Sequence, residues 1–185
     1  MVTKKLLLLL GFLVAQTLSY GSSSTSVIIE NKDPSRLDLS GKIVTSKEVM
    51  IDYPALIKVL ILDSCNLRSL PVEIKLFSNL EHISIKYNPD LDWHLTIASL
   101  KCFEKLKFLD LSSNGIEEVP SNMAELSHLT GLKLSYNQLL IKKACITLKE
   151  IPKLKWLWID NNNLKIFPAS LYCFPKLKFL YCYDN

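Results

Sequence analysis

The stretch Leu154–Leu164, LKWLWIDNNNL, decides the fold because it joins a strand-like alternation to a run of asparagines. In an extended chain, residues two apart point to the same side, so Leu157 and Ile159 share one face of a short strand. The opposite face carries Trp156, Trp158 and Asp160. Large apolar side chains therefore stand on both faces, and the stretch alone does not decide which face is buried.

The same stretch belongs to a pattern, L-x-x-L-x-L-x-x-N-x-L, that recurs along the chain. Copies that match every fixed position begin at Leu106, Leu129 and Leu154. The copy at Ile57 has Cys65 in the asparagine position. Further copies are incomplete, and they lie around Leu37, at Leu80 and at Leu177.

The spacing of the copies is nearly constant. The second leucine or isoleucine of successive copies falls at Leu37, Leu60, Ile83, Leu109, Leu132, Leu157 and Leu180. The steps between them are 23, 23, 26, 23, 25 and 23 residues. Several copies also carry an apolar–proline pair, at Leu70-Pro71, Val119-Pro120 and Phe167-Pro168. A short strand at every step predicts stacked repeats that complete one another's core.

These motifs resemble the leucine-rich repeat family, in the subtype with repeats of roughly 23 residues and a Leu-Pro signal. The resemblance covers about residues 34–185. It implies an α/β fold, a curved solenoid with a parallel β-sheet on the concave face and short helices, 3-10 turns or extended segments on the convex face. In that fold Leu157 and Ile159 point into the core, so the tryptophans of the same strand point onto the concave face.

The recurring asparagines are expected to be structural. At an inward turn, their amides can satisfy backbone groups of the adjacent repeat that would otherwise be buried without partners. They are Asn88, Asn114, Asn137, Asn162 and Asn185. On the convex side, helices are expected at 92–100, with Asp92 as the N-cap, and within 139–150. Thr45 and Glu48 form a capping-box pattern that precedes another apolar cluster.

The first 21 residues have the order of a secretory signal peptide. A basic start precedes an apolar run over 6–18 and small residues up to Gly21. The run is short for a bilayer span, which takes about 20 residues, and an uncleaved anchor is the alternative. We expect a signal peptide at 1–21, a leader and degenerate capping repeat at 22–56, leucine-rich repeats at 57–176 and a truncated final repeat at 177–185. No membrane span is expected after signal cleavage.

Charge and cysteine content narrow the function classes. The formal net charge is +4, and removal of Lys4 and Lys5 leaves 20 basic against 18 acidic residues, so charge gives no argument for nucleic acid. Five widely spaced cysteines without a C-x-x-C motif do not indicate zinc, and their disulfide pairing stays open. They are Cys65, Cys102, Cys145, Cys173 and Cys182. No cofactor is expected.

The concave positions of the last repeats are rich in aromatic residues. Contiguous exposed aromatic side chains are typical of binding surfaces, and nearby charged residues can form a polar rim. The predicted partner-binding residues are Phe108, Asp110, Lys133, Tyr136, Trp156, Trp158, Asp160, Phe179, Tyr181 and Tyr183. The alternative is a passive surface on which the rings pack against one another.

A basic ladder precedes the strands, at Lys58, Lys107, Lys155 and Lys178. It is interpreted either as a solvated edge or as a contact for anionic glycans or a membrane surface. Catalytic chemistry is not indicated: His82, Ser84 and Asp63 share the concave face, but no nucleophile elbow or oxyanion motif accompanies them.

We therefore predict a secreted, non-enzymatic protein that recognises a protein ligand through its aromatic-rich concave face. The first alternative is a structural or assembly protein, including a homodimer formed through an uncapped C-terminal edge. The second is a fragment of a larger receptor or effector whose functional domain lies beyond residue 185. In a third, the repeats would present a substrate to a separate catalytic domain.

Overall fold

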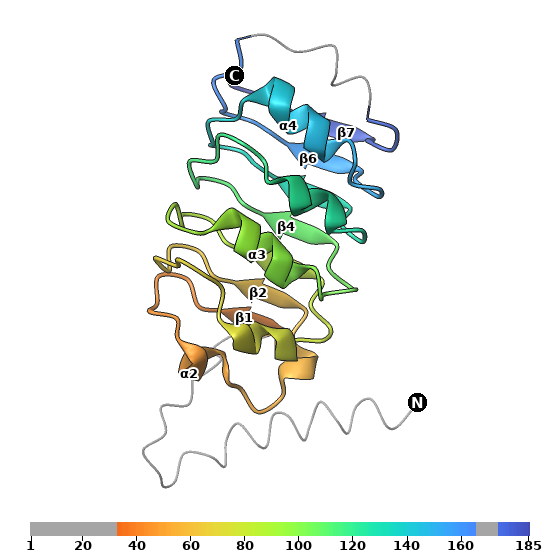
Figure 1. The fold of residues 1–185 in the computed structure, drawn as a ribbon. Helices are drawn as coiled ribbons and strands as arrows, with labels where there is room; N and C mark the ends of the chain where they lie inside the picture. Colours follow the sequence, from red (N-terminus) through yellow and green to blue (C-terminus); the bar gives the residue numbers. More distant parts are fainter. Residues whose placement is uncertain (1–32, 166–173) are drawn as a thin grey trace, which may run out of the picture.

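The computed structural model describes residues 33–165 and 174–185, in which seven short strands form one parallel sheet (Figure 1). The strands follow the sequence order across the sheet, so each repeat lies beside the next one along the chain. Their bounds are β1 Arg36–Asp38, β2 Val59–Ile61, β3 His82–Ser84, β4 Phe108–Asp110, β5 Gly131–Lys133, β6 Trp156–Trp158 and β7 Phe179–Tyr181. This topology confirms the predicted solenoid.

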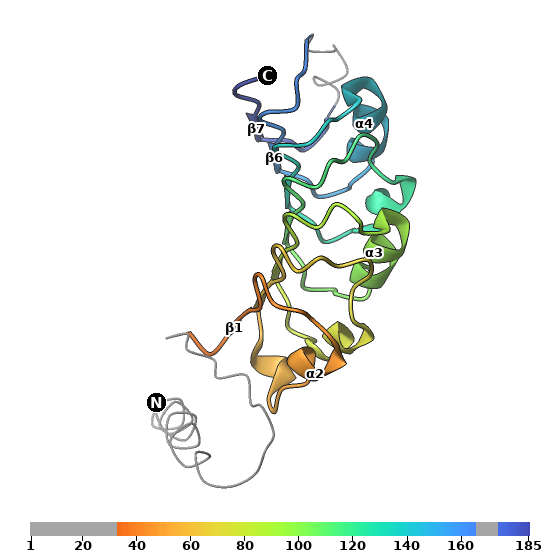
Figure 2. The same cartoon turned by 90° about the vertical axis from the view of Figure 1, so that its left-hand side faces the viewer.

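Short helices connect the strands on the other side of the stack. The α-helices are α2 Ser46–Val49, α3 Trp93–Leu100 and α4 Ile141–Leu148, and the 3-10 helices are η1 Pro54–Leu56, η2 Val72–Leu76 and η3 Ser121–Glu125. Figure 2 shows the sheet on the inner side of a gentle bend and the helices on the outer side. The helices α3 and α4 fall in the two longer repeats, as predicted, because the additional residues complete their turns.

Local sequence signals set where these helices begin. The Asp92 carboxylate caps α3 by accepting a hydrogen bond from the Leu95 N–H at 2.9 Å. Thr45 and Glu48 form both halves of the predicted capping box at α2. Pro71 and Pro120 each precede a 3-10 helix, with φ at −57°.

Some predictions fall on parts of the chain outside the described residues. These are the signal peptide at 1–21, the Leu-Pro signal at Pro168, and Cys173. Within 33–165 and 174–185, no helix has the length and apolarity needed to cross a membrane.

The core is a column of apolar side chains that runs through the whole stack. Each of the strands β1 to β6 contributes its central residue, and the residue two positions later joins the same column, while Leu180 of β7 and Cys182 pack against it partly buried. In β6 these are Leu157 and Ile159, and neither side chain has any solvent exposure. Burial of such a side chain contributes about 1.5–3 kcal/mol, and in a stack of repeats each repeat relies on its neighbours for this burial. The burial confirms which face of the strand is the core.

A ladder of asparagine side chains joins the repeats beside this core. The Asn137 Oδ1 accepts hydrogen bonds from the backbone N–H groups of Asn114 and Ile116, both at 3.0 Å, in the preceding repeat. Its Nδ2 donates to the carbonyl oxygens of Leu111 at 3.1 Å and Leu134 at 2.9 Å. The amide thus satisfies four backbone groups that water cannot reach, and the predicted structural role is confirmed.

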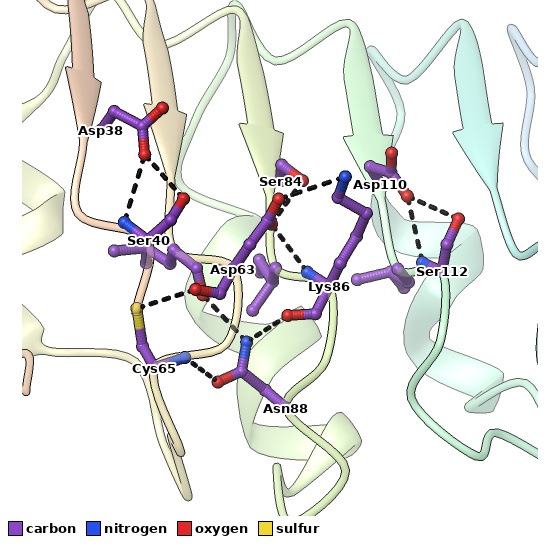
Figure 3. Close-up of polar contacts among 12 residues, drawn as sticks. Asp38, Ser40, Asp63, Cys65, Ser84, Lys86, Asn88, Asp110 and Ser112 are labelled. Atoms are coloured by element: carbon purple, nitrogen blue, oxygen red, sulfur yellow. Dashed lines mark hydrogen bonds and ion pairs between the residues drawn. The ribbon is translucent and has the colours of Figure 1, made fainter. Parts of the chain in front are cut away.

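Cys65 replaces an asparagine in this ladder and retains only part of its bonding (Figure 3). The Sγ lies 3.1 Å from the Leu39 carbonyl oxygen and 3.3 Å from that of Asp63, the positions that an asparagine Nδ2 would reach. The Cys65 N–H donates to Asn88 Oδ1 at 3.1 Å, so the ladder continues toward the C-terminus. Burial raises the pKa of the Cys65 thiol, which keeps it protonated as a donor.

A left-handed residue precedes the ladder position in each repeat and turns the chain inward. The φ angles lie between 51° and 59° at the non-glycine positions Ser64, Tyr87, Ser113, Tyr136, Asn161 and Asp184. Most of these types are small or are asparagine and aspartate, which adopt this conformation more readily than others. Tyrosine has no such preference, and each left-handed residue of this kind costs about 1–3 kcal/mol.

Candidate protein-binding surface

The strand register defines which residues share the concave face. At the first strand position, the aligned residues are Arg36, Val59, His82, Phe108, Gly131, Trp156 and Phe179. At the third position they are Asp38, Ile61, Ser84, Asp110, Lys133, Trp158 and Tyr181. Because parallel strands lie about 4.8 Å apart, side chains that follow one another in a row are in contact range.

Two pairs of aromatic rings stack in parallel across β6 and β7. The ring centroids of Trp158 and Tyr181 are 4.9 Å apart with planes inclined by 3°, and those of Trp156 and Phe179 are 6.1 Å apart with planes inclined by 1°. The ring centroids of Tyr183 and Tyr181 are 6.5 Å apart, with planes inclined by 52°. Phe179 remains 48% exposed and Tyr183 69% exposed, so the stacked rings still face solvent.

A further ring extends this surface to β4. The Phe108 ring meets Trp158 edge-on, with centroids 5.5 Å apart, although the two residues are two strands apart. Gly131 makes this possible, because a Cβ at that position would lie 2.5 Å from Phe108 Cδ2. His82 stacks against Phe108 from β3, at 5.5 Å and 19°. We call Phe108, Trp156, Trp158, Phe179, Tyr181 and Tyr183 the aromatic surface.

Gly131 and His82 take part in this arrangement, but the sequence prediction did not include them among the binding residues. Both occupy the same register row as Phe108 and Trp156. That row was the available signal. The row predicts which residues lie on neighbouring strands, but it does not predict that the Phe108 ring will occupy the space beside Gly131.

Lys133 lies within the aromatic surface. Its Nζ is 5.3 Å from the Trp158 ring centroid and 5.7 Å from that of Phe108. Such cation–π contacts contribute about 0.5–1 kcal/mol where water has access. The two rings thereby hold an ammonium group over the middle of the concave face.

The two predicted carboxylates are engaged by their own and neighbouring repeats. Asp160 accepts hydrogen bonds from the Ser135 hydroxyl at 3.0 Å and from the Tyr183 N–H at 2.8 Å. Asp110 accepts from the N–H and the hydroxyl of Ser112, at 3.0 and 2.7 Å (Figure 3). These bonds orient the turns after the strands and leave only part of each carboxylate for a ligand.

Tyr136 stands apart from the stacked rings in the part of the chain that the structure describes. It lies on the left-handed turn after β5, and its side chain is 62% exposed. Tyr87 occupies the corresponding turn after β3 and is 56% exposed. The structure therefore brings together the predicted residues of β4 to β7 and places Tyr136 beyond their edge.

Hydrogen-bonded polar side chains lie on the N-terminal half of the concave face, next to Val59 and Ile61 (Figure 3). Asp63 accepts hydrogen bonds from the Ser84 hydroxyl at 2.6 Å and the Lys86 N–H at 2.9 Å, and it pairs with the Lys86 ammonium at 3.2 Å. Burial of Lys86 acts to lower its pKa, but the Asp63 carboxylate outweighs this effect and the pKa is raised. Because Ser84 donates to Asp63 while His82 stacks on Phe108, these side chains do not form the nucleophile–base pair of a hydrolase.

The lysines at the strand entrances meet different neighbours along the stack. Glu81 occupies the same place in its own repeat, and its carboxylate lies 3.7 Å from the Lys58 Nζ and 2.7 Å from the Lys107 Nζ. The hydrogen bond from Lys107 lowers the pKa of Glu81. Within 33–165 and 174–185, no three histidine, cysteine or acidic residues are grouped so that they could hold a metal ion.

Comparison with known proteins supports the repeat assignment. The family model Leucine Rich Repeat matches residues 105–126. The chain resembles a leucine-rich repeat protein of Leptospira interrogans, with a TM-score of 0.56 and 23% identity, over 70% of this chain and 32% of that one. It also resembles an internalin, inlF, of Listeria monocytogenes, with a TM-score of 0.51 and 21% identity, over 71% of this chain and 36% of that one. The family match, the topology and these likenesses support a leucine-rich repeat solenoid as the fold of this chain.

Two curated relatives from Dictyostelium discoideum are much longer proteins. Ras guanine nucleotide exchange factor V is 30% identical over 181 residues, which cover 79% of this chain and 9% of that protein. The probable inactive serine/threonine-protein kinase roco10 is 31% identical over 127 residues, which cover 66% of this chain and 5% of that protein. The chain thus spans less than a tenth of either relative. Leucine-rich repeat domains generally act as scaffolds for protein–protein interaction, and that is the function class that the fold supports.

Proposed function

We propose that this protein recognises a protein ligand through the aromatic surface on its concave face. The single observation that carries the proposal is the contiguous set of half-buried and exposed rings over β4, β6 and β7. Each ring is held by its neighbour, so little side-chain entropy remains to be lost on binding. Tryptophan and tyrosine in such rigid arrangements are enriched among binding hot spots.

A passive surface, on which the rings only pack against one another, explains less of where the rings lie on the concave face. Ring packing alone could be satisfied on any part of the concave face. Here the rings gather at one end, while the other end carries the hydrogen-bonded pairs of Asp38 with Ser40 and Asp63 with Ser84. An apolar patch of this kind exposed to water is costly unless a partner covers it.

The test compares two matched tryptophan substitutions. Trp156→Ala with Trp158→Ala removes the centre of the aromatic surface, whereas Trp93→Ala removes a tryptophan from α3 on the convex side. A protein that is captured by the wild type and by Trp93→Ala, is lost by the double variant, and then binds in purified form would support the proposal. Equal capture by all three forms would contradict it.

We further propose that the protein is secreted, on the basis of the signal-peptide pattern at 1–21.

The second candidate function is self-association at the C-terminal edge. Among the described strands, β7 pairs only with β6, and Leu180 of β7 and Cys182 just after it are only partly buried. A second copy could cover that edge. Light scattering tests this directly, and a monomer over a wide concentration range would exclude it.

A further inference from the structure

Charge is unevenly distributed between the two ends of the solenoid. Residues 130–185, which contain β5 to β7 and α4, carry nine lysines and no arginine against three acidic residues, a net charge of +6. Residues 33–129 carry ten basic against 14 acidic residues, a net charge of −4. The nearly balanced total net charge therefore conceals a basic C-terminal half, and β6 and β7 of this half carry most of the aromatic surface.

Two lysines of this half immediately precede the Trp156–Phe179 pair in the sequence. Lys155 and Lys178 each occupy the position just before a strand, Lys155 before β6 and Lys178 before β7. The Lys178 N–H donates to the Lys155 carbonyl oxygen at 2.8 Å, which makes the two residues direct neighbours. In the described part of the chain neither ammonium forms an ion pair, and residues 166–173 contain no acidic side chain.

The same entrance position is neutralised at the other end of the stack. There Glu81 lies between Lys58 and Lys107 and contacts both ammonium groups. At the C-terminal end, Lys155 and Lys178 lie on neighbouring strands, and among the described residues no carboxylate pairs with either one. Like charges on neighbouring strands are unfavourable in the free protein. An anionic group placed between them would relieve this repulsion.

The acidic residues near the rings do not supply that anion. Asp160 is engaged by the Ser135 hydroxyl and the Tyr183 N–H. Lys133 is held over Phe108 and Trp158, and among the described residues it also has no carboxylate within ion-pair distance. The charged groups near the aromatic surface that remain available to a ligand are therefore the ammonium groups of Lys133, Lys155 and Lys178.

We infer that the aromatic surface binds an acidic protein segment, whose carboxylates meet Lys155, Lys178 and Lys133 while its apolar side chains cover the rings. This inference rests on the proposed function and specifies the chemistry of the partner. Charge complementarity of this type steers association and selects among partners more than it adds raw affinity.

The geometry of the rings favours a protein segment over other anions. Nucleobases need open aromatic faces on which to stack. In the two parallel pairs, each ring already presents one face to its partner, and Phe108 presents its edge to Trp158. What remains is a surface of ring edges with a few open faces, which suits aliphatic and aromatic side chains between carboxylates.

The experiment is a selection of random peptides displayed on phage against the purified protein, followed by binding of the synthetic peptides that emerge. We expect enrichment of segments that combine glutamate or aspartate with apolar residues. Replacement of their acidic residues by glutamine or asparagine should weaken binding at least tenfold. Lys155→Glu with Lys178→Glu should weaken the same peptides by about tenfold, the effect of two charge contacts.

The matched control has the same change in charge on the convex side. Lys142→Glu with Lys149→Glu places two reversals on and next to α4, and peptide binding should change by less than about twofold. Equal weakening by both charge-reversed pairs would show that only net charge matters, which would overturn the assignment to this surface.

The outcomes separate the two proposals. Peptides that are neutral or basic, and that are lost in the Trp156→Ala and Trp158→Ala double variant, would overturn the acidic partner and leave the aromatic surface as a binding site. A selection that yields no peptide dependent on these tryptophans would overturn both proposals. Tryptophan-dependent binding of a thymidine oligonucleotide, a heparin fragment or phosphatidylserine vesicles, with no such binding of acidic peptides, would replace the protein segment by that class of anion.

Discussion

The Phe108 ring lies in the space that a side chain on Gly131 would fill, since a Cβ there would be 2.5 Å from Phe108 Cδ2. This close approach lets a residue of β4 contact Trp158 of β6 across an intervening strand. Phe108 joins the other rings because the neighbouring position in its row, Gly131, has no side chain.

We predict that Gly131→Ala displaces the Phe108 ring from Trp158. The ring can rotate toward solvent, so the cost in unfolding free energy should be small, about 1–3 kcal/mol, while the near-UV circular dichroism of the stacked rings should change clearly. In the double variant with Phe108→Ala, the effect of Gly131→Ala on stability should largely disappear, because the clash is gone. Additive effects in that cycle would argue against the contact.

Leu157→Ala should destabilise the protein by about 2–5 kcal/mol, because it opens a cavity in the fully buried column. Trp156→Ala should cost less, although the residue removed is larger, since its ring is only half-buried on the concave face. Chemical denaturation measures both. A larger loss for the tryptophan than for the leucine would reverse our assignment of the two faces.

Asn137→Ala should destabilise by at least about 2 kcal/mol, because it leaves buried N–H groups of Asn114 and Ile116 without an acceptor. Asn137→Cys should lie between wild type and alanine, since the Cys65 Sγ donates to the Leu39 carbonyl oxygen at 3.1 Å and so shows that a thiol can replace the Nδ2 donor. Indistinguishable denaturation midpoints for the alanine and cysteine variants would remove the donor role of the thiol.

The ion pair between Lys86 and Asp63 predicts a dependence of stability on alkaline pH. Burial acts to lower the pKa of Lys86, yet in the folded state the nearby Asp63 carboxylate raises this pKa above its ordinary value of 10.5. The contribution to stability is therefore complete below pH 10.5 and is lost as the pH rises through the higher folded-state pKa. Other lysines and tyrosines titrate in the same range, so the test is the difference between wild type and Lys86→Met. That difference should shrink at high pH, and a constant difference would refute the linkage.

The secretion proposal predicts the intact mass of the native protein. A chain that has lost its signal peptide should begin near Ser22, and mass spectrometry would show this directly. Retention of Met1 to Gly21 would contradict the proposal. Comparison with and without a reductant would count disulfides, which the spacing of the cysteines does not reveal.

The fold followed from the sequence because its determinants are local and repeated. Leucines two residues apart define a strand face, and Asp92 or Pro120 sets the start of a convex segment within a few residues. The asparagine ladder was also predictable, since an amide at a fixed place in every repeat meets the same backbone groups each time. Assembly of the repeats then needs only a constant step along the chain.

The binding surface was predictable only in part. The alternation in Leu154–Leu164 and the register of its neighbours place Trp156, Trp158, Phe179 and Tyr181 on one face. The lean of Phe108 over Gly131, the position of Lys133 over two rings and the use of Asp160 by Ser135 depend on side-chain orientation. Such orientations follow from contacts between residues more than 20 positions apart, which no local pattern encodes.

The sequence by itself therefore determined the repeat length, the buried face and the turn chemistry, because these arise from short-range alternation and hydrogen bonding within a repeat. The tertiary structure alone decided which rings touch, which carboxylates are already engaged and which lysines stand without an acidic neighbour within the described residues. The physical reason is that stacking brings side chains of different repeats within about 5 Å of one another, and their mutual packing then selects one arrangement among the rotamers that each residue could adopt alone.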